Sequence, residues 1–349
     1  MPSDTDRRDA APPRRPRATG RVTLQDVATA AGVSPITVSR ALRGERAVDP
    51  QLVLRVEAAA KRLGYVPDPA ARALASARSH HVAVLIPLLS NALFVDLLEA
   101  VQRVLRPAGY QTLIGITHYD RAEEEQLLRE QLLHRPSGLI VTGLDHSEGT
   151  QRLIDDSGVP CVHVMELDAS GQRYTVGFSQ AEAGAALVDA LWAAGHRRIA
   201  FAAAQLDPRT MQRRDGWRSA LQRHGAFDPT LEWLHPAPSS MALGGHLFEQ
   251  ILGVRPAIDA IFFCNDDLAQ GALLAAQRLR VKVPQRVAVA GFNDLTGSEQ
   301  MHPPLTTVRT PRAAIGEEAA RLLLRCMRGE AVAATPVDLG FEVVWRQSA

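Results

Sequence analysis

Mostly polar segments follow a series of apolar runs in the larger, C-terminal part of the sequence, and their residue types suit the binding of a small polar molecule. Arginine can hold a carboxylate, and aspartate, glutamate and asparagine can accept hydrogen bonds from hydroxyl groups. The sequence contains no glycine-rich phosphate loop, no G-x-S-x-G motif and no histidine pair at metal-ligand spacing. We therefore expect a binding site and not an enzyme, with neither a metal ion nor a cofactor. The segments are residues 88–91, 118–119, 166, 205–213, 265–267 and 293–294.

The elements that position these segments alternate between apolar runs and amphipathic stretches from His81 onward. Runs such as "VAVLIP" are typical of strands that are buried on both faces, so we predict parallel sheets covered by helices. The pattern restarts after "YTVGF", which predicts two α/β lobes with the polar segments at the carboxyl ends of the strands. Segments near "LTTVRT" and "VDLGFEVVW" are expected to cross between the lobes. The predicted domain spans residues 81–349, with an N-lobe at about 81–178 and 309–330 and a C-lobe at about 179–308 and 331–349.

The stretch "VTLQDVATAAGVSPITVSRAL" near the N-terminus predicts two short helices joined by a tight turn. Thr23 and Asp26 can form a capping box, Gly32 permits the turn, and Ser34-Pro35 provides a cap followed by proline in the first turn. A third helix is expected from Pro50 onward, capped by Asp49 and ended by Gly64. Residues 21–66 thus predict a small all-α helix-turn-helix unit, whose second helix fits the major groove of DNA.

The outward face of the second predicted helix carries side chains that suit DNA. The small hydroxyl groups of Ser34, Thr37 and Ser39 match phosphate oxygens, while Arg40 matches guanine and Ile36 matches a thymine methyl group. The alternative is a small helical bundle with no role in DNA binding, because its buried positions would follow the same pattern.

The charge of the chain is close to balanced, so any basic surface must be local. The net charge is +1 over 349 residues, yet residues 1–21 carry six arginines against three aspartates. Residues 1–20 are predicted to be a disordered arm, with a DNA-contacting arm as the alternative. The three cysteines are far apart, which predicts neither a disulfide framework nor a metal site. The start lacks the apolar core of a signal peptide and no apolar run could span a membrane, so we expect a cytoplasmic, nucleoid-associated protein without membrane contact.

The N-terminal motif, with "VLRVEAAAKRLGYVPDPAARALAS" behind it, resembles the lactose-repressor family of bacterial transcription regulators. The resemblance covers roughly residues 21–345 and implies a two-lobed effector domain of the periplasmic-binding-protein type. It also implies a hinge helix within residues 67–80 that folds on DNA, with Leu74 wedged into the minor groove; a plain linker is the alternative. By the same resemblance the base-reading residues are Pro35, Ile36 and Arg40, and the phosphate contacts are Thr23, Ser34, Thr37 and Ser39.

Within that family, stretches such as "LDPRTMQRRDGW" and "FFCNDDLAQGALLAAQRLRVKVP" are most similar to the gluconate-operon repressor branch. The resemblance implies that Arg213 and Asp266 bind the effector, joined in this branch by Arg209 and Glu166. A sugar acid agrees with this choice, because its carboxylate needs a guanidinium group. Asp207 stands where the purine-binding branch has an arginine, which weighs against a purine. The predicted effector-binding set is Asn91, Phe94, Glu166, Arg209, Arg213, Asp266 and Asn293.

The combined expectation is a homodimeric, sequence-specific repressor of sugar-acid catabolism genes. A small molecule such as gluconate, 6-phosphogluconate or ketogluconate would release it from a palindromic double-stranded DNA operator. A different sugar effector or a corepressor remains open, and Arg213 could be a surface charge or Asp266 a helix cap. A transport-associated sugar-binding protein would have no use for residues 22–76, and an enzyme fused to a DNA-binding head would need a catalytic constellation. The C-terminus shows no leucine heptads, so no tetramerising coiled coil is predicted.

Overall fold

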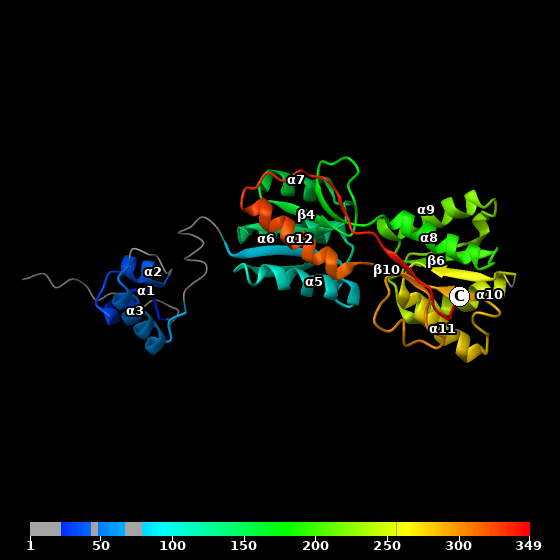
Figure 1. Cartoon of the computed structure of the whole chain (residues 1–349), viewed down its shortest axis with the longest axis horizontal. Helices are drawn as coiled ribbons and strands as arrows, with labels where there is room; N and C mark the ends of the chain where they lie inside the picture. The colour runs from blue at the N-terminus through cyan, green and yellow to red at the C-terminus, as the bar shows by residue number, and fades with distance from the viewer. Residues whose placement is uncertain (1–21, 43–47, 67–78, 256) are drawn as a thin grey trace, which may run out of the picture. The chain divides into compact units, whose positions relative to one another are not determined.

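The computed structural model describes residues 22–42, 48–66, 79–255 and 257–349. The chain separates into two compact units, Met1–Ala77 and Arg78–Ala349, which we call the headpiece and the two-lobed unit (Figure 1). No helix among the described residues has the length and apolar character needed to cross a membrane.

The headpiece contains the three helices that its sequence predicts: α1 (Leu24–Ala31), α2 (Pro35–Leu42) and α3 (Pro50–Leu63). Thr23 and Asp26 form the expected capping box, and Gly32 ends α1 in a left-handed conformation with φ of 67°. Asp49 caps α3 through its side chain. Val27, Val38 and Val56, one from each helix, are fully buried in a shared core, because each helix presents its apolar stripe to the other two.

The N-lobe is built on a parallel six-stranded sheet in the order β11-β5-β4-β3-β1-β2. The sheet is covered on both faces, as strand β1 shows. Its residues Val82, Val84 and Ile86 belong to one apolar cluster, and Ala83 and Leu85 belong to another. Helices α5 (Ala92–Leu105) and α12 (Arg312–Met327) pack on the first side and α6 (Arg121–Leu133) and α7 (Glu148–Ser157) on the second (Figure 1). The strands are β1 (His81–Ile86), β2 (Gln111–Ile116), β3 (Gly138–Thr142), β4 (Cys161–Val164), β5 (Tyr174–Gly177) and β11 (Val337–Asp338).

The C-lobe repeats this arrangement with a parallel four-stranded sheet in the order β7-β6-β8-β9. Helices α8 and α9 pack together, as do α10 and α11 (Figure 1). The elements are α8 (Gln180–Ala193), β6 (Ile199–Ala204), α9 (Pro208–Arg223), a short 3-10 turn η1 (Pro229–Leu231), β7 (Glu232–His235), α10 (Met241–Val254), β8 (Ala260–Phe263), α11 (Asp266–Leu279) and β9 (Ala288–Ala290). The predicted fold class, helix-turn-helix helices plus two parallel α/β lobes, is confirmed.

The predicted crossing segments form a separate antiparallel pair, β10 (Thr307–Arg309) and β12 (Glu342–Val344). The predicted lobe boundary after residue 330 is wrong, because β11 pairs with β5 in the N-lobe sheet, Val337 opposite Val176. The chain leaves α12 on the N-lobe and adds an edge strand there before it crosses, so the N-lobe extends to about Asp338.

Candidate functional site

The second helix of the headpiece presents the side chains predicted to touch DNA. Ile36 is 66% exposed, so its apolar side chain is available for contact with a partner. The Ser34 hydroxyl accepts a hydrogen bond from the amide of Thr37 at 3.2 Å and so caps α2. Arg40 is exposed, whereas Pro35, Thr37 and Ser39 are half-buried. This surface has the polar and apolar groups that reading a major groove requires.

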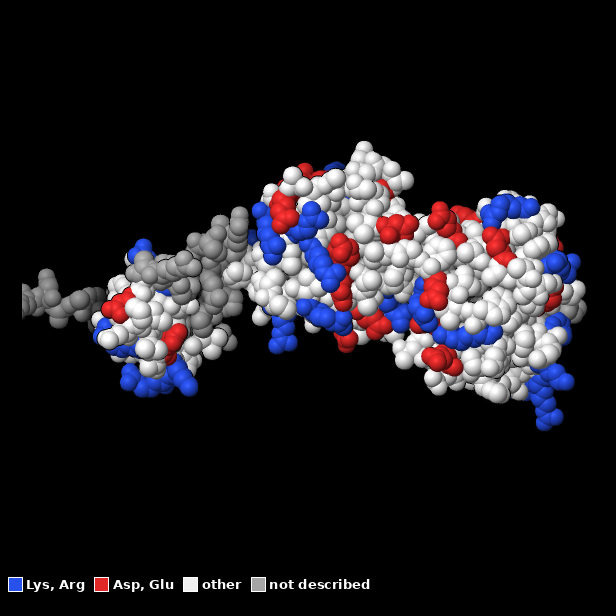
Figure 2. All heavy atoms as spheres, viewed as in Figure 1, with Lys and Arg blue, Asp and Glu red and all other residues white. Residues whose placement is uncertain are grey.

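Charge is distributed differently over the two units. Figure 2 shows basic side chains gathered along one edge of the headpiece, whereas basic and acidic side chains are mixed over the visible face of the lobes. Thr23, predicted as a phosphate contact, is half-buried and its side chain is used in the capping box of α1. Leu74, the predicted minor-groove wedge, lies outside the described residues.

A cavity of about 240 Å³ lies at the carboxyl ends of the strands in the two-lobed unit. Its walls come from both lobes and combine guanidinium, carboxylate, amide and hydroxyl groups with a few apolar side chains. Among the described residues no group of His, Cys, Asp and Glu side chains could hold a metal ion. The lining residues are Leu88, Ser90, Asn91, Leu93, Phe94, Tyr119, Met165, Gln205, Asp207, Arg209, Thr210, Arg213, Ser239, Ser240, Met241, Asn265, Asp267 and Asn293.

Arg213 lies on α9 in the wall of this cavity and is only 6% exposed. Its Nε donates to Gln180 Oε1 at 2.8 Å, its Nη1 donates to the Cys264 carbonyl at 2.7 Å, and its guanidinium stacks 4.0 Å from the Phe292 ring centroid. Within the described chain its Nη2 makes no hydrogen bond to protein. Burial lowers the pKa of this guanidinium, so a carboxylate in the cavity would supply charge compensation that the ligand-free protein lacks.

Close packing of α8 against α9 fixes the position of Arg213. A Cβ atom at Gly184 would lie 2.6 Å from the Arg213 carbonyl oxygen, and one at Gly216 would lie 2.0 Å from that of Ala181. Only glycine allows the two helix backbones to approach this closely. The two glycines therefore set the depth at which the Arg213 side chain enters the cavity.

Arg209 lies one turn earlier on α9 and meets carboxylates from both lobes. Its Nη2 is 3.2 Å from Asp207 Oδ1, and its Nη1 is 3.5 Å from Glu166 Oε2 in the N-lobe. Burial alone would lower the pKa of Arg209, but Asp207, Tyr119 and Glu166 raise it overall. The Nη1 atom is buried and has no hydrogen-bond partner in the described structure, although carboxylate oxygens of Glu166 and Asp145 lie 3.5 and 3.8 Å from it.

Glu166 and Gly143 form the N-lobe side of the contact with Arg209. Glu166 is buried, accepts hydrogen bonds from the Leu144 amide and from Gln212, and stands behind Arg209, outside the cavity lining. Gly143 has φ of 84°, and a Cβ atom there would lie 2.3 Å from Arg209 Nη1. The structure thus brings Glu166 to the site, but as a partner of Arg209 and not as a wall residue.

Three more residues of the predicted effector-binding set, Asn91, Phe94 and Asn293, line the cavity as expected. Asn91 caps α5 by accepting from the Leu93 amide, and Phe94 follows in the first turn of the same helix. Asn293 enters from the loop after β9, is 3% exposed, and its Oδ1 is buried without a partner in the described structure. Arg209 Nη1 and Asn293 Oδ1 are thus a buried donor and a buried acceptor without hydrogen-bond partners, each on a residue that lines the cavity.

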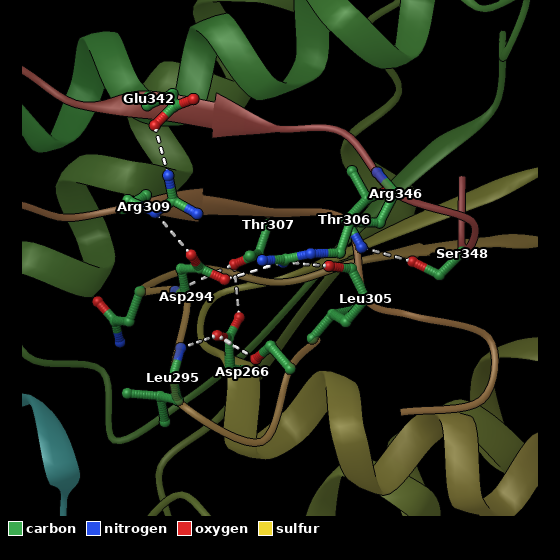
Figure 3. A network of polar contacts seen from close by, with 12 residues as sticks. Asp266, Asp294, Leu295, Leu305, Thr306, Thr307, Arg309, Glu342, Arg346 and Ser348 are labelled. Atoms are coloured by element: carbon green, nitrogen blue, oxygen red, sulfur yellow. Dashed lines mark hydrogen bonds and ion pairs between the residues drawn. The ribbon is translucent and has the colours of Figure 1, made fainter. Parts of the chain in front are cut away.

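Asp266 is the exception, because it does not line the cavity and its carboxylate points towards Thr307 and the Leu295 amide (Figure 3). It is 0% exposed, and its carboxylate accepts from Thr307 Oγ1 and Ser298 Oγ at 2.6 Å each and from the Leu295 amide at 2.7 Å. Burial raises its pKa, although these three hydrogen bonds oppose the shift. Asp266 was predicted to bind the effector, but in this structure its carboxylate binds other protein groups and does not line the cavity. Helix α11 begins at Asp266, its cap is Asn265, and the wall is made by Asn265 and Asp267 on either side.

Sequence reasoning also missed wall residues that only the fold brings in. Ser239, Ser240 and Met241 lie between β7 and the first turn of α10, and all three line the cavity. The sequence feature that could have located them is a helix N-cap: the Ser240 hydroxyl accepts a hydrogen bond from the Leu243 amide at the start of α10. Tyr119 was among the polar segments but outside the predicted set. It lines the cavity, Arg209 lies 5.8 Å from its ring centroid, and burial raises its pKa to about 12, so it stays a neutral donor.

Comparisons with known proteins agree over nearly the whole chain. Residues 23–68 match the family described as bacterial regulatory proteins, lacI family, and residues 188–349 match the periplasmic binding protein-like domain. The chain is 54% identical over 332 residues to the HTH-type transcriptional regulator GntR of Pseudomonas aeruginosa, which covers 95% of this chain and 97% of that protein. It is 36% identical to the regulator of the same name from Escherichia coli K12, over 92% of this chain and 96% of that one.

Two solved structures share the arrangement. The transcription regulator GntR from Chromobacterium violaceum superposes with a TM-score of 0.75 at 49% identity and covers 77% of this chain and 98% of its own. The lac repressor dimer bound to operator and the anti-inducer ONPF superposes with a TM-score of 0.84 at 26% identity and covers 94% of this chain and 99% of its own.

Proposed function

This chain belongs to the lacI family of bacterial regulatory proteins and is a DNA-binding transcriptional regulator, and we propose that it is a repressor whose effector is a sugar acid of the gluconate type. The observation that carries the proposal is the cavity wall to which α9 contributes Arg209 and Arg213, where Arg213 Nη2 makes no hydrogen bond to the described protein. A carboxylate suits Arg213 Nη2, and hydroxyl groups suit the amide, carboxylate and hydroxyl side chains that share the cavity wall.

The neighbouring carboxylates refine the ligand chemistry. Asp207 and Asp267 line the cavity, and Glu166 stands behind Arg209. The carboxylate oxygens of Asp207 and Asp267 can accept hydrogen bonds from hydroxyl groups of a ligand, whereas Glu166 acts through Arg209. A neutral hexose would add no negative charge beside the buried Arg213 guanidinium, whereas a molecule with one carboxylate and several hydroxyls matches both kinds of group.

DNA binding is proposed to involve the exposed face of α2, in a homodimer on a palindromic operator. Ile36 and Arg40 are the base-reading candidates, and Pro35, Thr37 and Ser39 lie on the same helix. Leu74 stays a prediction for the minor groove, outside the described residues. A relative that is structurally similar over 94% of this chain was solved as an operator-bound dimer, which supports the same assembly.

Regulation follows from linkage. If the sugar acid binds best to a lobe arrangement that does not fit DNA, it weakens operator binding by the factor by which DNA weakens its own binding. Calorimetry with gluconate, 2-ketogluconate and 6-phosphogluconate tests the ligand class, and no heat from any of them would contradict it. Selection of bound DNA from a random pool, with and without the ligand that binds, gives the operator, its symmetry and the sign of the coupling.

A further inference from the structure

We infer that Arg312, the first residue of α12, is a positioning residue that holds the two walls of the effector cavity together across the lobes. The inference rests on the effector site proposed above. It concerns a side chain that does not itself line the cavity.

Arg312 makes contacts in two directions. Its Nε donates to Asp96 Oδ2 on α5, at 2.5 Å. Its Nη1 donates to the carbonyl of Asn293 at 2.6 Å and to that of Asp294 at 3.2 Å, and its Nη2 donates to Asp294 at 3.3 Å. One guanidinium thus binds the N-lobe helix α5 and the C-lobe loop after β9 at the same time.

Both partners of Arg312 belong to segments that form the cavity. Helix α5 starts at its cap Asn91 and carries Phe94, and both line the cavity, with Asp96 less than one turn further on. The loop supplies Asn293, whose Oδ1 is the unsatisfied buried acceptor. Arg312 therefore sets the distance between the Asn91–Phe94 wall and the Asn293 wall.

The loop itself is held in an unusual backbone conformation. Asn293 and Asp294 have φ of 113° and 50°, in the left-handed region that residues with a Cβ atom rarely adopt. On the C-lobe side the loop is fixed by Asp294, which pairs with Arg309 and Arg346 at 2.8 Å each, and by the Leu295 amide bound to Asp266 (Figure 3). Arg312 adds the connection from this anchored loop to α5.

The start of α12 supports a dedicated role for Arg312. A cation at a helix N-terminus opposes the helix dipole, and α12 has no side-chain cap to compensate. A nearby glycine keeps the helix in register with α5, because a Cβ atom at Gly316 would lie 2.4 Å from the Leu97 carbonyl oxygen. The arginine is locally unfavourable, and its contacts with Asp96 and the loop explain its presence.

The test uses the full-length chain, three single variants and the double variant that combines Arg312→Gln with Asp96→Asn. Arg312→Gln removes both connections, and Asp96→Asn weakens only the one to α5. Arg103→Gln is the matched control, since Arg103 joins α5 to Glu317 of α12 but contacts neither the loop nor the cavity. Gluconate affinity is measured by calorimetry, and hydrogen exchange is followed in ligand-free protein for peptides spanning residues 91–96 and 291–296.

We expect Arg312→Gln to weaken gluconate binding at least tenfold and to speed exchange in both peptides at least threefold, with Arg103→Gln unchanged in both assays. Because Arg312 and Asp96 act through one contact, the double variant should lose no more than twofold beyond Arg312→Gln alone. Affinity and exchange of Arg312→Gln within twofold of wild type would overturn the inference, as would fully additive losses. If the Arg312→Gln variant does not fold, Asp96→Asn decides, because the Asp96 side chain is 39% exposed and its replacement leaves the core intact.

Failure of the proposed function would look different. If wild-type protein gives no heat with gluconate, the ligand assignment fails. The exchange measurement still decides the role of Arg312, because it needs no ligand.

Discussion

Replacing Arg213 by glutamine tests the proposed carboxylate site most directly. The variant removes the Nη2 donor offered to the ligand, together with the two hydrogen bonds that orient it towards Gln180 and the Cys264 carbonyl. A hydrogen bond to a charged partner is worth about 1.5–3 kcal/mol. At about 1.4 kcal/mol for each factor of ten, the Kd for gluconate should rise roughly 10- to 150-fold.

The same change affects folding, so stability has to be measured beside affinity. Two buried acceptors lose their donor, which costs about 1–3 kcal/mol each, while removal of a poorly compensated buried cation offsets part of that loss. We expect a modest fall in the free energy of unfolding of ligand-free protein. Calorimetric titration at a temperature where thermal unfolding shows the variant to be native then isolates the ligand effect.

The adjacent arginine provides the control. Arg214 follows Arg213 on α9 but pairs with Asp215 and Glu232 and does not line the cavity. Arg214→Gln should leave the Kd within twofold of wild type. The reasoning is refuted if Arg213→Gln binds gluconate within threefold of wild type, or if both variants lose affinity equally, since neither result fits a ligand held by Nη2.

Four further outcomes follow from other parts of the molecule. Ile36→Ala should change headpiece stability by less than about 0.5 kcal/mol because the side chain is 66% exposed, yet it should lower operator affinity in a gel-shift titration. Asp266→Ala should lower the free energy of unfolding by at least about 3 kcal/mol, because it leaves three buried donors unpaired. Asp267→Asn should instead reduce gluconate affinity with little effect on denaturant midpoint. Burial and the neighbouring His146 lower the pKa of His163 from 6.5 to about 4, so the unfolded state binds more protons between these values. Stability should therefore fall as the pH drops below 6.5, by about 2 kcal/mol at pH 5, and a pH-independent denaturant midpoint in wild type would contradict this.

The three helices of the headpiece could be predicted almost entirely from the sequence, for a local reason. Its helix boundaries depend on contacts between residues only a few positions apart, such as Thr23 with Asp26 and the left-handed turn at Gly32. The apolar stripe then leaves one arrangement in which Val27, Val38 and Val56 share a core. The two lobes could also be predicted from the sequence. Strands that are buried on both faces and the helices that cover them differ in the spacing of their apolar residues.

The sequence also located the cavity to within a few residues, since polar segments at strand ends converge in a parallel α/β sheet. Arg209 and Arg213 lie one turn apart on α9, so both could be assigned to one wall from their spacing. The edge strand β11 could not be foreseen, because two residues carry no periodic pattern and their pairing with β5 is decided by where α12 ends.

Only the tertiary structure shows which side chain of "CNDD" faces the cavity. Successive residues of a helix point about 100° apart, so Asn265, Asp266 and Asp267 cannot all face the cavity, and the sequence does not say how α11 is rotated. Packing against the loop and crossing strand β10 settles this by enclosing Asp266 with Thr307, Ser298 and the Leu295 amide. Sequence alone determined which chemistry gathers at the cavity, and the tertiary structure decided which groups reach it, because direction depends on packing between segments far apart in the chain.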